Sequence, residues 1–101
     1  MDLNTAIRMA VDTGKTILGS DSAKKLAMLG EVKAIVVARN CQPSVKQDIV
    51  HYAALSSVPI LTFAGSSSEL GVICGKPFPV SALSVIDAGN SDILKLAEEN
   101  R

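Results

Sequence analysis

The chain has 101 residues, enough for one domain of ordinary size and too few for two. Hydrophobic residues make up 48% of it and charged residues 20%, a balance that excludes a disordered chain. Basic and acidic side chains are equal in number, so the net charge by itself gives no sign of a polyanionic partner. We therefore predict a single domain over residues 1–101.

The sequence shows neither a secretion signal nor a membrane-spanning segment. No apolar run reaches the roughly 18 residues that cross a bilayer, and the first residues, Met1-Asp2-Leu3-Asn4, lack the apolar centre of a secretion signal. We expect a cytoplasmic protein without a membrane partner. Cys41 and Cys74 are too few for a metal site of their own, so we expect two buried thiols, no metal and no cofactor.

Charge is unevenly distributed along the chain. From Lys15 to Lys46, six bases stand against two acids and leave a net charge of +4, whereas beyond Val85 four acids outnumber two bases. A localised basic segment is what an anionic partner requires, and it is also common on an ordinary solvated surface. On charge alone both interpretations stay open.

Hydrophobic periodicity predicts helices that alternate with strands. Apolar residues at helical spacing over residues 3–11 predict a first helix, which ends at Gly14. β-Branched residues predict a short strand at 15–18. Ser20, Asp21 and Ser22 then supply N-cap oxygens for a second helix, which ends at Gly30.

The second half of the chain repeats this alternation. Residues 34–38 are continuously apolar, which is typical of a strand covered on both faces. A helix at 45–56, a strand at 60–63 and a short helix from the capping box of Ser66 and Glu69 to residue 74 follow. Prolines break residues 75–79, a fourth strand is expected at 80–86, and Ser91 caps a last helix that ends near Glu99. We predict a three-layer α/β/α sandwich with a four-stranded sheet.

No motif points to catalysis. The glycine-rich residues 65–76 have the wrong spacing for a phosphate-binding P-loop, and Pro77 stands where that loop needs a hydroxyl. His51, the only histidine, fits a solvent-facing helix position better than a dyad with a cysteine. We therefore predict that the protein is not an enzyme. A small enzyme or redox switch built on Cys41, Cys74 and His51 is the contrasting hypothesis.

Several loop residues have no predicted role in the core. The turn Gly19-Ser20 opens a helix, whose N–H groups and dipole attract phosphate. Lys24 and Lys25 are expected in the first turn of that helix, where an external anion or chance explains them equally well. Arg39-Asn40 follow the buried strand, and an amide can hydrogen-bond a base edge. Because parallel strands end at one edge of a sheet, we expect these loops to lie close together.

Phe78 lies between Pro77 and Pro79 in a chain that has only three aromatic residues. A rigid loop can hold its ring, together with Val80, against an unstacked base. The alternative is that the ring folds back over the core, and the sequence leaves both open.

Together, these residues resemble the archaeal and eukaryotic L30e family of large-subunit ribosomal proteins, within the L7Ae superfamily of kink-turn RNA binders. The resemblance covers nearly the whole chain, and the segments that carry it are Thr13-Gly14-Lys15 to Gly19, Ile35-Val36-Val37-Ala38-Arg39-Asn40, Asp48 to Leu55, Glu69-Leu70-Gly71, Gly75-Lys76-Pro77, and Val80-Ser81-Ala82-Leu83 through Asp87-Ala88-Gly89. It implies an α/β/α sandwich whose last strand runs against its neighbour, and no catalysis. Asp21 departs from the family, which often has a basic or amide side chain there.

The function implied by the resemblance is that of a structural constituent of the large ribosomal subunit. Such a protein stabilises a kink-turn or bent element of rRNA, contacts neighbouring ribosomal proteins, and is a monomer when free. The alternative is a non-ribosomal kink-turn protein of a small ribonucleoprotein.

The resemblance also implies a set of RNA-binding residues. By position, the turn Gly19-Ser20 approaches the RNA backbone, and Lys25 pairs with a phosphate or a purine edge. Asn40 forms a hydrogen bond at the kink, and Phe78 with Val80 covers an extruded base. Flanking phosphate contacts are assigned to the remaining bases, Lys24, Arg39, Lys46 and Lys76.

Overall fold

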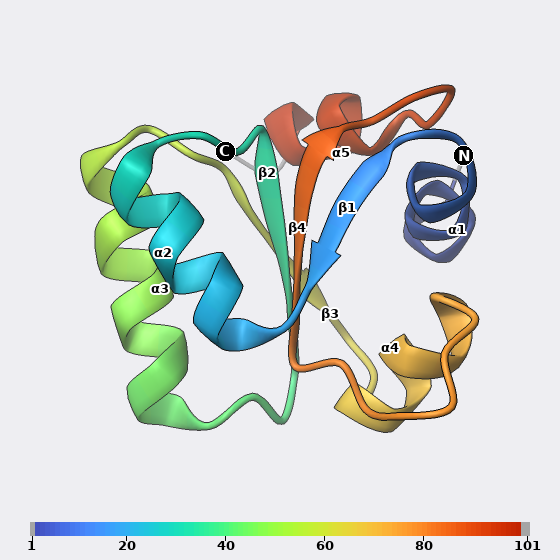
Figure 1. Cartoon of the computed structure of the whole chain (residues 1–101), viewed down its shortest axis with the longest axis horizontal. Helices are drawn as coiled ribbons and strands as arrows, with labels where there is room; N and C mark the ends of the chain where they lie inside the picture. The colour runs from blue at the N-terminus through green and yellow to red at the C-terminus, as the bar shows by residue number, and fades with distance from the viewer. Residues whose placement is uncertain (1, 100–101) are drawn as a thin grey trace.

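The computed structural model describes residues 2–99 and has a four-stranded sheet between two layers of helices (Figure 1). The strands are β1 (Lys15–Leu18), β2 (Ala34–Ala38), β3 (Ile60–Phe63) and β4 (Ala82–Asp87). The helices are α1 (Leu3–Thr13), α2 (Ser20–Leu29), α3 (Pro43–Leu55), α4 (Ser67–Ile73) and α5 (Ile93–Glu99). The predicted three-layer sandwich is confirmed.

The sheet is mixed, with strand order β1-β4-β2-β3. β4 runs antiparallel to both of its neighbours, which confirms the direction implied for the last strand, and β2 runs parallel to β3. The carboxyl ends of β1, β2 and β3 therefore lie at the same edge of the sheet as the amino end of β4. We call this the carboxyl edge, and it lies at the bottom of Figure 1.

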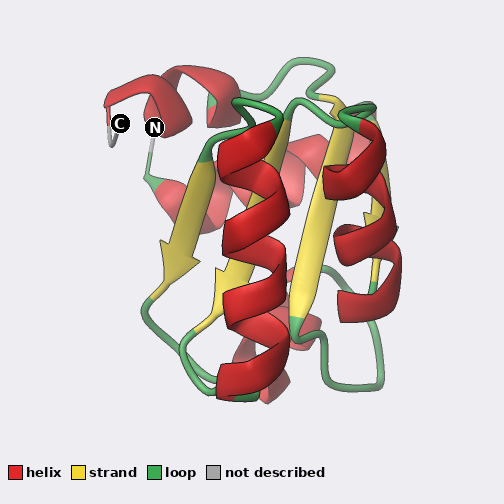
Figure 2. Cartoon of the chain, turned by 90° about the vertical axis from the view of Figure 1, so that its left-hand side faces the viewer, coloured by secondary structure: helices red, strands yellow, loops and turns green. Residues whose placement is uncertain are grey.

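Both faces of the sheet are buried, as the apolar pattern of β2 predicts. Val36 points into a cluster formed with α1, α4 and α5, whereas Ile35 and Val37 point into a second cluster formed with α2 and α3. Figure 2 shows α2 and α3 side by side over this second face. Each such aliphatic side chain contributes about 1.5–3 kcal/mol by its burial, so the core fixes the sheet that positions the loops.

The start of α2 differs from the prediction. The N-cap is Gly19, with a φ of +119° and no side-chain hydrogen bond to cap the helix, so the expected N-cap oxygens of Ser20, Asp21 and Ser22 are wrong. The N–H of Gly19 still pairs with the carbonyl of Ala82 in the sheet (2.9 Å), which leaves a single residue to reverse the chain. Glycine adopts this conformation with little strain. Because the helix begins at Ser20, Lys24 and Lys25 lie in its second turn and not in its first.

The predicted start of β4 is also wrong by two residues. The strand begins at Ala82, and Val80 instead donates its N–H to the carbonyl of Ser67 in α4 (2.9 Å). An apolar residue beside a strand resembles a strand residue in the sequence, although here it is buried against α4. In α3 the helix begins at Pro43, two residues early, because proline is favoured in the first turn.

The chemically reactive side chains are placed largely as expected. Cys41 and Cys74 are buried free thiols, and burial raises the pKa of both. His51 is exposed on α3, with its ring 5.1 Å from that of Tyr52. Within residues 2–99, no helix is long and apolar enough to cross a bilayer, and no three His, Cys, Asp or Glu side chains gather into a metal-binding group.

Candidate nucleic-acid interface

Four segments that are far apart in the sequence meet at the carboxyl edge. Besides the bond from Gly19 to Ala82, the N–H of Ala38 donates to the carbonyl of Ser81 (2.9 Å) and that of Arg39 to the carbonyl of Gly65 (3.1 Å). These bonds join the turn before α2, the loop after β2, the loop after β3 and the loop before β4. The expected convergence of the loops is therefore present in the fold.

The turn before α2 presents backbone to solvent. A Cβ at Gly19 would have no neighbour within 4 Å, so glycine is required there by its φ and not by crowding. The exposed Lys25 lies one turn further along α2, beside a hollow of about 470 Å³ that is lined by Asp21, Lys24, Lys25, Met28 and Tyr52. Asp21 lies in the first turn, where the helix dipole stabilises a carboxylate.

Lys24 has a structural partner. Its Nζ lies 3.3 Å from a carboxylate oxygen of Asp48, and the pair joins α2 to α3. Both side chains are about half exposed, so the pair contributes less than about 1 kcal/mol to folding. Lys46, in the first turn of α3, is half-buried. These two cations are therefore less available to a ligand than the exposed Lys25, Arg39 and Lys76.

Asn40 is exposed after β2, and its amide is oriented by the protein. Its Oδ1 accepts a hydrogen bond from the backbone N–H of Ser67 at 2.7 Å. Because an N–H can only donate, the oxygen must face α4, and the Nδ2 group faces the other way. Among the described residues, Nδ2 donates to no acceptor. The side chain therefore offers hydrogen-bond donors at the carboxyl edge.

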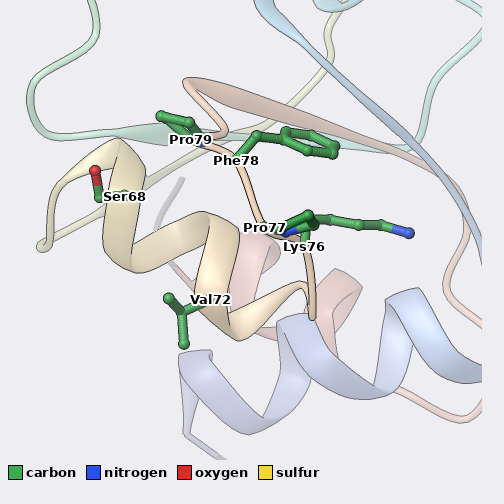
Figure 3. A pocket seen from close by; sticks show the side chains of 6 residues that line it. All are labelled: Ser68, Val72, Lys76, Pro77, Phe78 and Pro79. Carbon is green, nitrogen blue, oxygen red and sulfur yellow. The ribbon is translucent and has the colours of Figure 1, made fainter.

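Phe78 does not fold back over the core. Its side chain is 51% exposed and lines a pocket of about 270 Å³ together with residues of α4 and of its own loop, namely Ser68, Val72, Lys76, Pro77 and Pro79. Figure 3 shows the ring of Phe78 and the side chain of Lys76 extending from the loop on the same side, away from α4. An aromatic face next to a cation can stack a base and pair with its phosphate.

Val80 corrects one of the expectations for this loop. It is 2% exposed and packs in the cluster of α1, α4 and α5, so its side chain has no surface to offer a base. The sequence reasoning did not consider Val72 of α4, which is 73% exposed and lines the same pocket, although Figure 3 shows its side chain pointing away from the ring of Phe78. The available signal was its position on α4, two residues from the buried Leu70 and therefore off the apolar face.

The fold places part of the basic segment and the acidic segment at opposite ends of the sheet. The basic segment contributes Lys25 and Arg39 to the carboxyl edge, and Lys76 joins them from the loop before β4. The acidic segment follows the opposite end of β4, and its members are Asp87, Asp92, Glu98 and Glu99. Arg101, which the charge count included, lies outside the described residues. The separation is partial, because Lys15 and Lys33 lie at the opposite end of the sheet and Asp21 and Glu69 lie at the carboxyl edge. The excess of exposed bases at the carboxyl edge still favours an anionic partner there.

Comparison with known proteins tests the resemblance directly. Residues 1–95 match the family described as the ribosomal protein L7Ae/L30e/S12e/Gadd45 family. The chain belongs to this family. The match spans every strand, α1 to α4 and the four converging segments, so the resemblance identified from the sequence is confirmed.

Related proteins from archaea are similar over nearly their whole length. The large ribosomal subunit protein eL30 of Methanococcus vannielii is 52% identical over 99 residues, which cover 98% of this chain and 94% of that protein. That of Methanocaldococcus jannaschii is 50% identical, covering 98% and 90%. That of Methanopyrus kandleri is 42% identical over 93 residues, covering 92% and 85%.

Proposed function

We propose that this protein is a structural constituent of the large ribosomal subunit, and that its carboxyl edge binds a kink-turn-like element of rRNA. One observation carries the proposal. Exposed basic side chains, the oriented amide of Asn40 and the exposed ring of Phe78 lie together at the carboxyl edge of the sheet. The similarity to archaeal proteins named large ribosomal subunit protein eL30 supports the ribosomal setting. The role is binding and not catalysis.

The chemistry of the edge suits a bent RNA better than a straight duplex. A sharp bend brings two stretches of backbone together and leaves bases unstacked, and unstacked bases are what proteins recognise in RNA by stacking and hydrogen bonding. The turn at Gly19 and the exposed Lys25 lie against phosphates, Asn40 donates to a base edge, and Phe78 covers a splayed base beside Lys76. Regular duplex RNA offers no unstacked base to Phe78, so it forfeits that contact.

The neutral charge of the chain bears on how it would bind RNA. A net charge of zero gives little non-specific attraction to RNA, so the contacts of the carboxyl edge must carry the binding. We place the protein in the cytoplasmic ribosome, where neighbouring large-subunit proteins add contacts. Co-sedimentation of the protein with ribosomes would support this assignment, whereas co-sedimentation with small ribonucleoproteins would support the non-ribosomal alternative.

The test is titration of the purified protein into a kink-turn RNA and a straight duplex of equal length, at about 50 mM and about 200 mM salt. We expect a preference for the bent RNA that survives the higher salt. Equal binding to both RNAs that disappears with salt would contradict autonomous recognition.

Site variants refine this test. Lys25→Ala, Asn40→Ala and Phe78→Ala should each cost about 1–3 kcal/mol of binding to the bent RNA, because each removes one hydrogen-bond, ionic or stacking contact. The control is Lys95→Ala, which removes an exposed lysine from α5, far from the carboxyl edge. Wild-type affinity in all three site variants would remove the site assignment.

A further inference from the structure

The first residue of α4 links the two loops on which recognition depends. The N–H of Ser67 donates to Oδ1 of Asn40 at 2.7 Å, and the carbonyl of Ser67 accepts from the N–H of Val80 at 2.9 Å. Asn40 lies after β2, and Val80 lies near the end of the loop that carries Phe78. The backbone of a single residue therefore contacts both loops at the carboxyl edge.

We propose that the backbone N–H of Ser67 is a positioning group for RNA recognition, because it fixes the side-chain amide of Asn40. This inference rests on the proposed function. An exposed asparagine rotates freely, and rotation of the amide by half a turn exchanges its donors and its acceptor. With Ser67 bonded to Oδ1, the flipped amide would set an NH₂ group against an N–H and lose the bond. The RNA therefore meets a preformed donor.

A side chain that is already oriented increases affinity, because less side-chain entropy is lost when the RNA binds. A mobile polar side chain loses rotamer freedom when it binds, and a side chain already held in its bound orientation loses much less. The backbone N–H of Ser67 is free to hold the Asn40 side chain, since the first N–H groups of a helix have no partner within the helix. The bond satisfies one of these groups and orients Asn40 at the same time.

The local backbone geometry accepts a proline that removes this donor. Ser67 is the first residue of α4, a position that tolerates proline because its N–H is not used within the helix. Ser66 before it is extended, with φ −77° and ψ 168°, the conformation that a residue before proline prefers. Ser67→Pro therefore removes the N–H while keeping the carbonyl that holds Val80, and the proline Cδ takes the place of the hydrogen, so that Oδ1 of Asn40 must move away. Ser67→Ala is the matched control, because it keeps the N–H and changes only the side chain.

The experiment measures the affinity of each variant for the kink-turn RNA together with its thermal unfolding. Ser67→Pro should weaken binding by about fivefold to tenfold, the equivalent of one hydrogen bond, and Ser67→Ala should stay within about twofold of wild type. In an Asn40→Ala background, Ser67→Pro should have no further effect, because the group that it positions is already gone. Additive losses would show that proline acts through α4 and would overturn the proposal.

A second measurement needs no proline. Amide hydrogen exchange should show protection at Ser67 in the free wild-type protein, where a first-turn amide otherwise exchanges rapidly, and loss of that protection in Asn40→Ala. An unprotected Ser67 amide in the wild type would overturn the proposal even if Ser67→Pro failed to fold. A wild-type protein without preference for the kink-turn RNA would overturn the proposed function and this inference together. A retained preference with unchanged affinity in Ser67→Pro would overturn this inference alone.

Discussion

Gly71 is the position at which one methyl group tests the packing of the Phe78 loop against α4. It is buried within the helix, and a Cβ there would collide with the carbonyl of Phe78 and lie 3.5 Å from Cα of Pro79. In an open helix, replacing glycine by alanine stabilises a protein by roughly 0.5–1 kcal/mol, because glycine loses more backbone freedom on folding. The two effects have opposite signs at this position.

The magnitude follows from the kind of atom that is struck. The carbonyl of Phe78 is backbone, so relief requires the loop or the whole of α4 to shift, and overpacking of this kind costs about 1–3 kcal/mol. After subtraction of the gain in helix propensity, we expect Gly71→Ala to lower the free energy of unfolding by about 1 kcal/mol. For a domain of this size, that corresponds to a Tm lower by about 4–8 °C.

Thermal unfolding of Gly71→Ala beside Ser68→Ala measures this directly. Ser68 is exposed on the same helix, so its replacement adds helix propensity without touching the loop backbone and should leave the Tm equal or higher. Gly71→Ala should also weaken binding to the kink-turn RNA, because the displaced loop carries Phe78. A Tm above that of the wild type would refute the close packing of α4 against this loop.

Three further predictions concern the fold. Ser84 is fully buried in β4, and its hydroxyl has no hydrogen-bond partner among the described residues. Ser84→Ala should therefore raise the free energy of unfolding by about 1 kcal/mol in a denaturant titration. A lower free energy of unfolding would show that the hydroxyl is hydrogen-bonded in solution. Because burial raises the pKa of Cys41 and Cys74, both thiols should react slowly with iodoacetamide at pH 8 until the protein is unfolded, and rapid labelling of the folded protein would contradict their burial. Asp2 caps α1 by accepting from the N–H of Thr5 at 2.9 Å, and hydrogen bonds from the side chain and then the backbone of Thr5 lower the pKa of its carboxyl from the usual value. Because the folded-state pKa is lowered, the charged cap stabilises the fold above the unfolded-state pKa of the carboxyl, and this stabilisation is lost as the pH falls through the folded-state pKa. Asp2→Ala should therefore lower the Tm at pH 7 more than at pH 2. An equal difference at both pH values would count against the cap.

Local patterns in the sequence predicted each helix and strand, although the starts of α2, α3 and β4 were misplaced. The continuous apolar run of β2 predicted a strand covered on both faces, because no solvent-facing position interrupts it, and both faces are indeed buried. Ser66 and Glu69 predicted the start of α4, since the hydroxyl of Ser66 accepts from the N–H of Glu69 at a fixed spacing of three residues. The resemblance to the family also came from the sequence alone, and it is confirmed.

The site depended on contacts that no local pattern records. Val80 and Phe78 are both apolar residues of one loop, and only the packing of α4 against that loop decides that the first is buried and the second exposed. The bond from Ser67 to Asn40 joins residues 27 positions apart, and it exists because β2 pairs in parallel with β3, which brings the loops after both strands to one edge. Thus the sequence by itself determined the elements and the buried faces, which depend on neighbouring residues. The tertiary structure decided which side chains and backbone groups meet at the carboxyl edge, because that depends on strand order and helix packing.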